Sequence, residues 1–130
     1  MRVLLADVQP KVRSALQLLL NHEPDVRVVG DVDDAENLLT QILSAHPDLI
    51  LVDWGLPGLS AIGSLPALRK DNPNLKVIVM SGRPEERQQA LTAGADVFVS
   101  KIDPPEQLLE ILHAMEKNRQ THGDLMSQNS

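Results

Sequence analysis

Four polar side chains stand where short apolar runs of this sequence end, and their chemical types suit a phosphoryl group. They are Asp7, Asp53, Ser81 and Lys101. Carboxylate oxygens, like backbone carbonyls, are hard ligands for Mg²⁺, and a carboxylate can itself be the nucleophile that accepts a phosphoryl group. A hydroxyl can hydrogen-bond one phosphoryl oxygen, and an ammonium can pair with another. Because such a transfer needs mostly positioning and charge neutralisation, it depends on whether the fold brings the four groups together.

The elements that must position these groups are short strands and amphipathic helices in alternation. Apolar runs too short for a helix predict buried strands at residues 3–6, 26–29, 49–52, 77–80 and 97–99, with Gly30 closing the second. Apolar residues at helical spacing predict helices over about residues 10–23, 34–46, 60–70, 84–93 and 105–115. Pro66 lies inside the third of these, where proline disfavours a helix. Asp33 or Asp34 is expected to cap the second helix.

This alternation demands a parallel sheet that is covered on both faces by right-handed crossovers, which is an α/β fold. In open sheets of this kind, ligands bind outside the carboxyl ends of the strands, where the strand order reverses. For the order 2-1-3-4-5 this point lies between the first and third strands. Asp7 and Asp53 would then face each other, with Ser81 and Lys101 alongside.

The length and composition of the sequence exclude several classes of protein and of binding site. Its 130 residues make one domain, and we expect residues 1–120 to form it, followed by a polar tail or the start of a linker at residues 121–130. The absence of cysteine excludes disulfides and cysteine-ligated metal sites. A net charge of −6 and only two aromatic residues make the chain a poor nucleic-acid binder by itself. No apolar run approaches the roughly 20 residues of a membrane span, and no signal peptide is visible, so we expect a cytoplasmic location without membrane contact.

Motifs of competing sites are missing from the sequence. It contains no GxGxxG after the first expected strand, no Walker A loop and no GxSxG elbow. The four histidines share no metal-ligand spacing. A flavin or small-molecule enzyme on this fold is therefore a weak hypothesis, since the chain lacks a Ser-, Thr- or Gly-rich phosphate loop.

Four segments together resemble the response-regulator receiver domain of two-component signalling. They are VLLAD (3–7), LILVDWGLPG (49–58), VIVMSG (77–82) and AGADVFVSK (93–101). The resemblance covers about residues 1 to 118, and the last segment, followed by a residue other than proline, is most similar to LuxR/NarL-type receivers. It implies a flavodoxin-like (βα)5 doubly wound parallel sheet with strand order 2-1-3-4-5.

The resemblance also implies a role for each residue of the expected site. Asp53 would be the phosphoacceptor; Asp7, Asp53 and the Gly55 carbonyl would hold Mg²⁺; Ser81 would be the switch hydroxyl, Phe98 the switch aromatic and Lys101 the pocket lysine. In the family the hydroxyl moves toward the phosphoryl group and the aromatic turns inward. This repacks the face that the fourth helix, fifth strand and fifth helix form.

Two positions depart from the family pattern. The family usually has an acidic pair after the first strand, whose second acid binds Mg²⁺ directly, whereas this chain has Asp7 and Val8. Valine cannot coordinate a metal, so the acidic pocket is atypical and we expect weak Mg²⁺ binding; the side-chain amide of Gln9 would be a weaker substitute. Ala61 stands where the family usually has glycine, and we expect it to adjust the loop without changing the chemistry.

Two functions remain open at this point. The first is a phosphorylation-switched receiver, not an enzyme, that takes a phosphoryl group from a sensor histidine kinase on Asp53 and controls an output partner or a homodimer. Its control of transcription would reach DNA only through an effector domain that this chain does not contain. The alternative is a degenerate receiver, disabled by Val8, that acts as a phosphorylation-independent interaction or dimerisation module.

Several of these residues also have simpler interpretations. Asp7 would cap the first helix, Ser81 would be a turn serine, Lys101 would be a solvated strand-end lysine, and Phe98 would be part of the core. Trp54 is expected to be half-exposed at the pocket rim, where it would report binding by fluorescence. The run Glu85, Glu86 and Arg87 is expected to form a charged helical face without a specific role.

Overall fold

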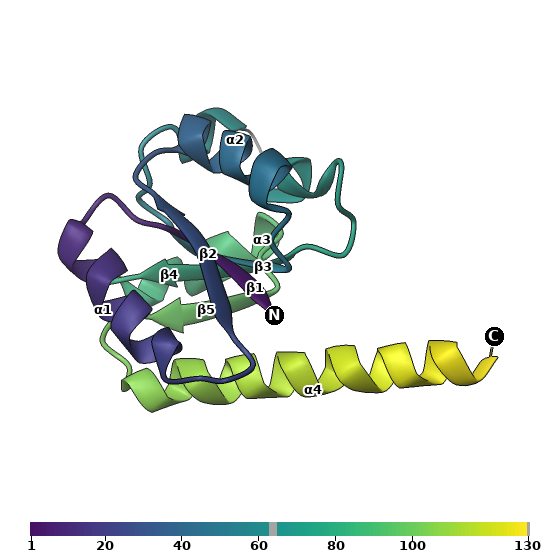
Figure 1. The fold of residues 1–130 in the computed structure, drawn as a ribbon. Coiled ribbons are helices and arrows are strands. Elements are labelled where there is room, and N and C mark those ends of the chain that lie inside the picture. Colours follow the sequence, from purple (N-terminus) through teal and green to yellow (C-terminus); the bar gives the residue numbers. More distant parts are fainter. Residues whose placement is uncertain (63–64, 130) are drawn as a thin grey trace.

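The five expected strands form one parallel sheet in the computed structural model, which describes residues 1–62 and 65–129 and the side chains of 1–62 and 65–119. The strands are β1 (Arg2–Ala6), β2 (Arg27–Val32), β3 (Leu49–Asp53), β4 (Lys76–Ser81) and β5 (Val97–Ser100). Their order is β2-β1-β3-β4-β5, and each neighbouring pair is parallel (Figure 1). The predicted α/β fold and its strand order are confirmed.

Helices cover both faces of the sheet. The described α-helices are α1 (Pro10–Asn21), α2 (Ala35–Ala45), α3 (Arg87–Thr92) and α4 (Pro105–Asn129). Because side chains alternate along a strand, successive residues of β1 enter different cores. Leu5 packs with Leu20 of α1 and Leu112 of α4, whereas Leu4 belongs to the core that contains Leu38 of α2. Figure 1 shows α2 above the sheet and α4 running beneath it and beyond it.

The segment expected to form an α-helix over residues 60–70 forms two 3₁₀ helices in its described parts. These are η1 (Leu59–Ile62) and η2 (Leu65–Arg69). Pro66 lacks the backbone N–H that a continuous α-helix would need there. The ring also packs on Gly94, where an added Cβ would lie 2.7 Å from the Pro66 Cδ and where φ is +116°. The expected α-helix is therefore wrong, because a contact with a distant turn fixes this segment.

The second strand is longer than its apolar run predicted. Gly30 was expected to close it, but β2 continues through Gly30 to Val32. The pairing with β1 shifts register at this point, where Leu4 pairs with Gly30. A Cβ on Gly30 would meet Leu4 Cδ1 at 3.3 Å and Gln41 Oε1 at 3.2 Å, so the glycine permits a close approach inside the sheet.

The helix ends follow their local sequence in part. Of the two expected capping residues, Asp34 caps α2 and accepts the N–H of Asn37 at 2.7 Å, and His46 ends the helix in a left-handed conformation. Composition predicted a polar tail from Thr121, and the backbone of α4 is helical to Asn129.

Within the described part of the chain, no helix combines the length and the apolar character that crossing a membrane requires.

Candidate functional site

Asp7 and Asp53 come together because they stand at the ends of neighbouring strands. β1 and β3 pair in register from Val3 with Leu49 to Ala6 with Val52, and the next residues along are Asp7 and Asp53. The strands leading to them are almost wholly buried, so the sheet fixes both backbones. The carboxyl edge of the sheet therefore presents two carboxylates side by side, as the strand order predicted.

Asp7 is buried, and each of its carboxylate oxygens has a partner. Oδ1 accepts the backbone N–H of Gln9 at 2.9 Å, and Oδ2 accepts the Lys101 ammonium at 2.6 Å. Its side chain is 1% exposed, against 15% for that of Asp53. Asp7 thus makes the local turn into α1 and also joins the site. Of the two carboxylates, only Asp53 is accessible to an incoming reagent.

Lys101 joins the two carboxylates. Its Nζ lies 2.6 Å from Asp7 Oδ2 and 3.0 Å from Asp53 Oδ1. Burial by itself lowers the pKa of the Lys101 ammonium, but its hydrogen bonds to Asp7 and Asp53 and the attraction of both negative charges outweigh burial and raise that pKa above its ordinary value of 10.5. The lysine is therefore a fixed positive charge in direct contact with Asp53, and not a solvated strand-end side chain.

Ser81 lies at the same edge but bonds elsewhere. It ends β4, pairs with Ser100 of β5, and its carbonyl accepts the Lys101 N–H at 2.8 Å. Its hydroxyl donates to Glu86 Oε1 at 2.6 Å and accepts the Arg83 N–H at 3.0 Å. The structure thus places Ser81 beside the Lys101 backbone, while the hydrogen bonds of its hydroxyl go to the segment that follows β4.

The two aromatic residues lie in different surroundings. Phe98 is 4% exposed and belongs to the core that also contains Val79 and Ala90. Its ring is already inside the protein in this structure, and its role as a switch aromatic stays a prediction. The Trp54 side chain is half-buried, as expected, and the backbone N–H of this residue donates to the Met80 carbonyl at 2.9 Å.

The two carboxylates at the acidic edge supply oxygen ligands of the kind that a hard cation prefers. Asp7 and Asp53 both contact the Lys101 ammonium, so their oxygens lie close enough to bind one cation that prefers oxygen ligands. The Gly55 backbone lies against the same site, since a Cβ there would be 3.3 Å from Asp53 Oδ2. Val8 is 46% exposed and adds no donor, and Gln9 reaches Asp7 through its backbone N–H. Among the described side chains, no three acidic, histidine or cysteine groups gather as a metal cluster.

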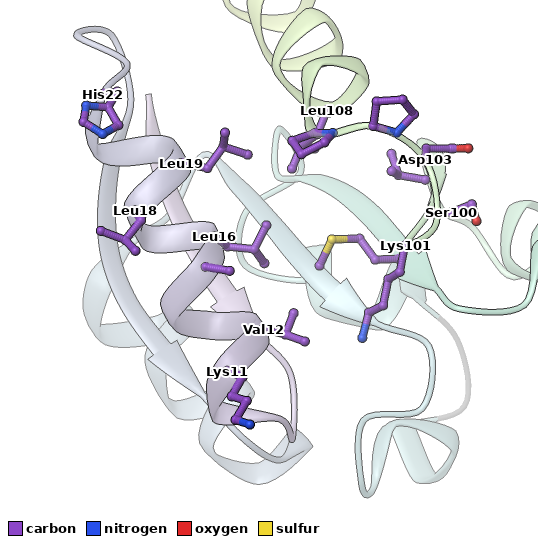
Figure 2. Close-up of a pocket in the computed structure, with 15 residues that line it drawn as sticks. Lys11, Val12, Leu16, Leu18, Leu19, His22, Ser100, Lys101, Asp103 and Leu108 are labelled. Carbon is purple, nitrogen blue, oxygen red and sulfur yellow. The ribbon is translucent and has the colours of Figure 1, made fainter.

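An apolar groove of about 620 Å³ runs beside the site between α1 and the start of α4. Figure 2 shows Leu16 and Leu19 of α1 on one wall and Leu108 of α4 on the other, with the Lys101 side chain opposite α1. The Lys101 stem thus lines the groove, and its ammonium reaches past the groove to the carboxylates.

Two residues near this edge make contacts that the sequence did not predict. Glu86, expected to be part of a charged helical face, accepts the hydrogen bond of the Ser81 hydroxyl. Arg13 of α1 donates from its guanidinium to the Asp7 carbonyl and lies 4.0 Å from Asp31. The only sequence signal for this contact of Glu86 was its position, since an acidic residue stands five positions after a serine at a strand end and near the start of an expected helix.

The profile of a known family matches most of the chain. Residues 3–113 match the family described as "Response regulator receiver domain". The chain is 34% identical over 113 residues to the nitrate/nitrite response regulator protein NarL of Escherichia coli (strain K12), which covers 85% of this chain and 52% of NarL. It is 30% identical over 115 residues to the uncharacterized transcriptional regulatory protein YxjL of Bacillus subtilis (strain 168), covering 87% of this chain and 53% of that protein. The chain thus spans about half the length of these curated relatives.

Solved structures share the fold. A two-component response regulator of the LuxR family from Aurantimonas sp. SI85-9A1 superposes with a TM-score of 0.78 at 25% identity, over 88% of this chain and 83% of that one. A DNA-binding response regulator of the LuxR family from Staphylococcus aureus gives a TM-score of 0.76 at 25% identity, over 87% of this chain and 96% of that one.

Proposed function

The chain belongs to the response regulator receiver domain family, with relatives of the LuxR/NarL type, and we propose that it is switched by phosphorylation of Asp53. Receivers of this family interact with sensor histidine kinases, so the phosphodonor would be a kinase phosphohistidine. The proposal rests on one observation above all. The Lys101 ammonium lies 3.0 Å from the accessible Asp53 carboxylate and 2.6 Å from the buried Asp7 carboxylate, so it holds the two side by side.

In the proposed reaction Asp53 and Asp7 have different roles, because their carboxylates differ in exposure and in hydrogen bonding. Asp53, with the more exposed carboxylate, is the nucleophile, whereas the buried and doubly bonded Asp7 fixes Lys101 in place. An Asp53 oxygen attacks phosphorus, the P–N bond to the kinase histidine breaks, and that nitrogen leaves with the bonding electrons. The products are an acyl phosphate on Asp53 and a neutral histidine, because the second ring nitrogen of the phosphohistidine carries a proton before the transfer. Lys101 then pairs with a phosphoryl oxygen, which suits its raised pKa because the ammonium stays charged.

Asp7, Asp53 and the Gly55 carbonyl are the groups that would hold Mg²⁺, which when bound neutralises charge on the phosphoryl oxygens. With Val8 where the family usually has a second acid, we expect weak affinity for this ion. Ser81 would donate to a phosphoryl oxygen, and Phe98 would support the changed packing of α3, β5 and α4. That face would then favour an output partner or a second copy, and DNA would be reached through an effector domain outside residues 1–130.

A direct test is phosphorylation by acetyl phosphate with saturating Mg²⁺, read by intact mass. The wild type should gain one phosphoryl group and Asp53→Asn should gain none. Asp71→Asn is the matched control, because Asp71 is exposed and lies outside the site; this variant should be labelled like the wild type. An adduct that survives Asp53→Asn would move the acceptor to another residue.

The absence of any adduct on the wild type would overturn this function in favour of an interaction module that needs no phosphorylation. Val8 is the residue that motivates this alternative, since it is exposed beside Asp7 and offers no ligand. Labelling of Val8→Asp but not of the wild type would identify Val8 as the residue that disables the site.

A further inference from the structure

The Ser81 hydroxyl has no hydrogen left to donate. A serine hydroxyl carries a single O–H donor. In this structure that donor goes to Glu86 Oε1 at 2.6 Å, and the oxygen accepts the Arg83 N–H at 3.0 Å. Ser81 is 3% exposed, so water does not compete freely for either bond. Neither bond reaches Asp53 or Lys101.

This arrangement conflicts with the part that Ser81 would play once Asp53 is phosphorylated. To donate to a phosphoryl oxygen, the hydroxyl must first leave Glu86. We propose that Glu86 is a positioning residue that holds Ser81 in a resting position and competes with the phosphoryl group for its single hydroxyl proton. The proposal rests on Asp53 phosphorylation and adds the residue that opposes it.

The backbone around Ser81 restricts how this competition can be resolved. The Ser81 carbonyl accepts the Lys101 N–H at 2.8 Å, and Ser81 pairs with Ser100, so the end of β4 is fixed against β5. Phe98 is already in the core. What can change is the Ser81 rotamer and the segment from Gly82 to Glu86. A Cβ on Gly82 would meet no atom within 4 Å, which leaves this segment room to move.

The same contact joins the pocket to α3. Glu86 ends η3 (Pro84–Glu86) and is the residue that precedes α3, whose described length is six residues. A carboxylate that leaves Ser81 therefore changes the start of this short helix. Because α3 belongs to the face proposed for the output partner, one hydrogen bond connects the state of Asp53 with that face.

The strength of the competition follows from the charge of Glu86. A hydrogen bond to a carboxylate is roughly twice as strong as one between neutral groups. Glu86→Gln keeps the side-chain length but offers a neutral acceptor, so it should release Ser81 more readily. We expect Glu86→Gln to tighten binding of a phosphoryl mimic by about fivefold, which is close to 1 kcal/mol.

The experiment titrates BeF3⁻, a phosphoryl mimic, with saturating Mg²⁺ and reads Trp54 fluorescence. Trp54 is the only tryptophan, the chain has no tyrosine, and the residue follows Asp53 directly. The matched control is Glu85→Gln, which removes the same charge from an exposed neighbour in the same turn and should change affinity less than about twofold. The gain of Glu86→Gln should vanish on a Ser81→Ala background, where no hydroxyl is left to release.

Two results of the titration would overturn the proposal. One is no gain in Glu86→Gln; the other is an equal gain in Glu85→Gln or on the Ser81→Ala background, which would show a general charge effect. A separate measurement without BeF3⁻ keeps this inference distinct from the phosphorylation itself. The Ser81 Hα–Hβ couplings should show one rotamer in the wild type and rotamer averaging in Glu86→Gln. If no variant binds BeF3⁻, the proposed function fails, and an unchanged Ser81 rotamer in Glu86→Gln would overturn the positioning role as well.

Discussion

The two ends of the site are built in different ways. The acidic end, formed by Asp7, Asp53 and Lys101, joins residues that lie up to 94 positions apart in the sequence. The hydroxyl end, formed by Ser81 and Glu86, joins residues only five positions apart, one at the end of β4 and the other in the three-residue 3₁₀ helix that precedes α3. The first depends on the sheet, so the backbones of Asp7 and Asp53 cannot shift without disturbing the core. The second depends on a short exposed segment, so it can change while the fold stays intact.

The largest expected effect comes from removing the ammonium at the acidic end. Lys101→Met leaves Asp7 buried without its cation, which should lower the free energy of unfolding by about 2–3 kcal/mol. This lies below the range for fully buried pairs because the Lys101 side chain is 22% exposed. Urea unfolding measures it, with Lys70→Met, at an exposed position, as the control that should change stability by less than about 0.5 kcal/mol. A loss below about 1 kcal/mol for Lys101→Met would contradict the view that this end is fixed by its ion pairs.

A second prediction concerns the ligand missing from the acidic end. Val8→Asp adds a carboxylate at an exposed position next to Asp7 and should tighten Mg²⁺ binding by about tenfold, because ligand charge raises affinity for this ion. Trp54 fluorescence follows the titration. Val8→Asn is the control, since it has nearly the same shape without the charge and should gain much less. Equal gains in the two variants would show that charge at this position is not what limits binding.

The hydroxyl end should contribute less to stability. Ser81→Ala removes the hydrogen bond to the Glu86 carboxylate and the acceptor of the Arg83 N–H. Glu86 is only partly buried and Arg83 is exposed, so both can bond water instead, and the expected loss is about 1 kcal/mol in urea unfolding. Glu86→Gln, measured in parallel, should cost no more than Ser81→Ala. A loss for Ser81→Ala as large as that of Lys101→Met would remove the contrast between the two ends.

The smallest effect is a pH dependence of the acidic end. The folded-state pKa of Lys101 is raised above 10.5, so its contribution to stability is complete below that pH and is lost as the pH rises through the raised pKa. The stability difference between wild type and Lys101→Met should therefore narrow in strongly alkaline solution. The difference between the two proteins is the quantity to measure, because other lysines titrate in both. A constant difference across this range would show that the ammonium is not held as the geometry indicates.

Strand ends were the best-predicted part of the molecule. The apolar runs ending at Asp7 and Asp53 are fully buried strands, and a parallel sheet places their ends at one edge. The segment over residues 60–70 was predicted wrongly, because its described parts are fixed by contacts with Ala93 and Gly94 that local propensity does not contain. The expected end of the second strand at Gly30 was wrong for a similar reason, because the place of Gly30 inside β2 depends on its close approach to Leu4 and Gln41.

Strand periodicity and a right-handed crossover topology were enough to predict that Asp7, Asp53, Ser81 and Lys101 lie along the carboxyl edge of the sheet, because they leave few other arrangements. How these groups pair depends on the folded side chains. Lys101 bonds both carboxylates, and Ser81 bonds Glu86. Such choices depend on rotamers and on distances of about 3 Å between atoms, which an alternation of apolar and polar residues does not encode.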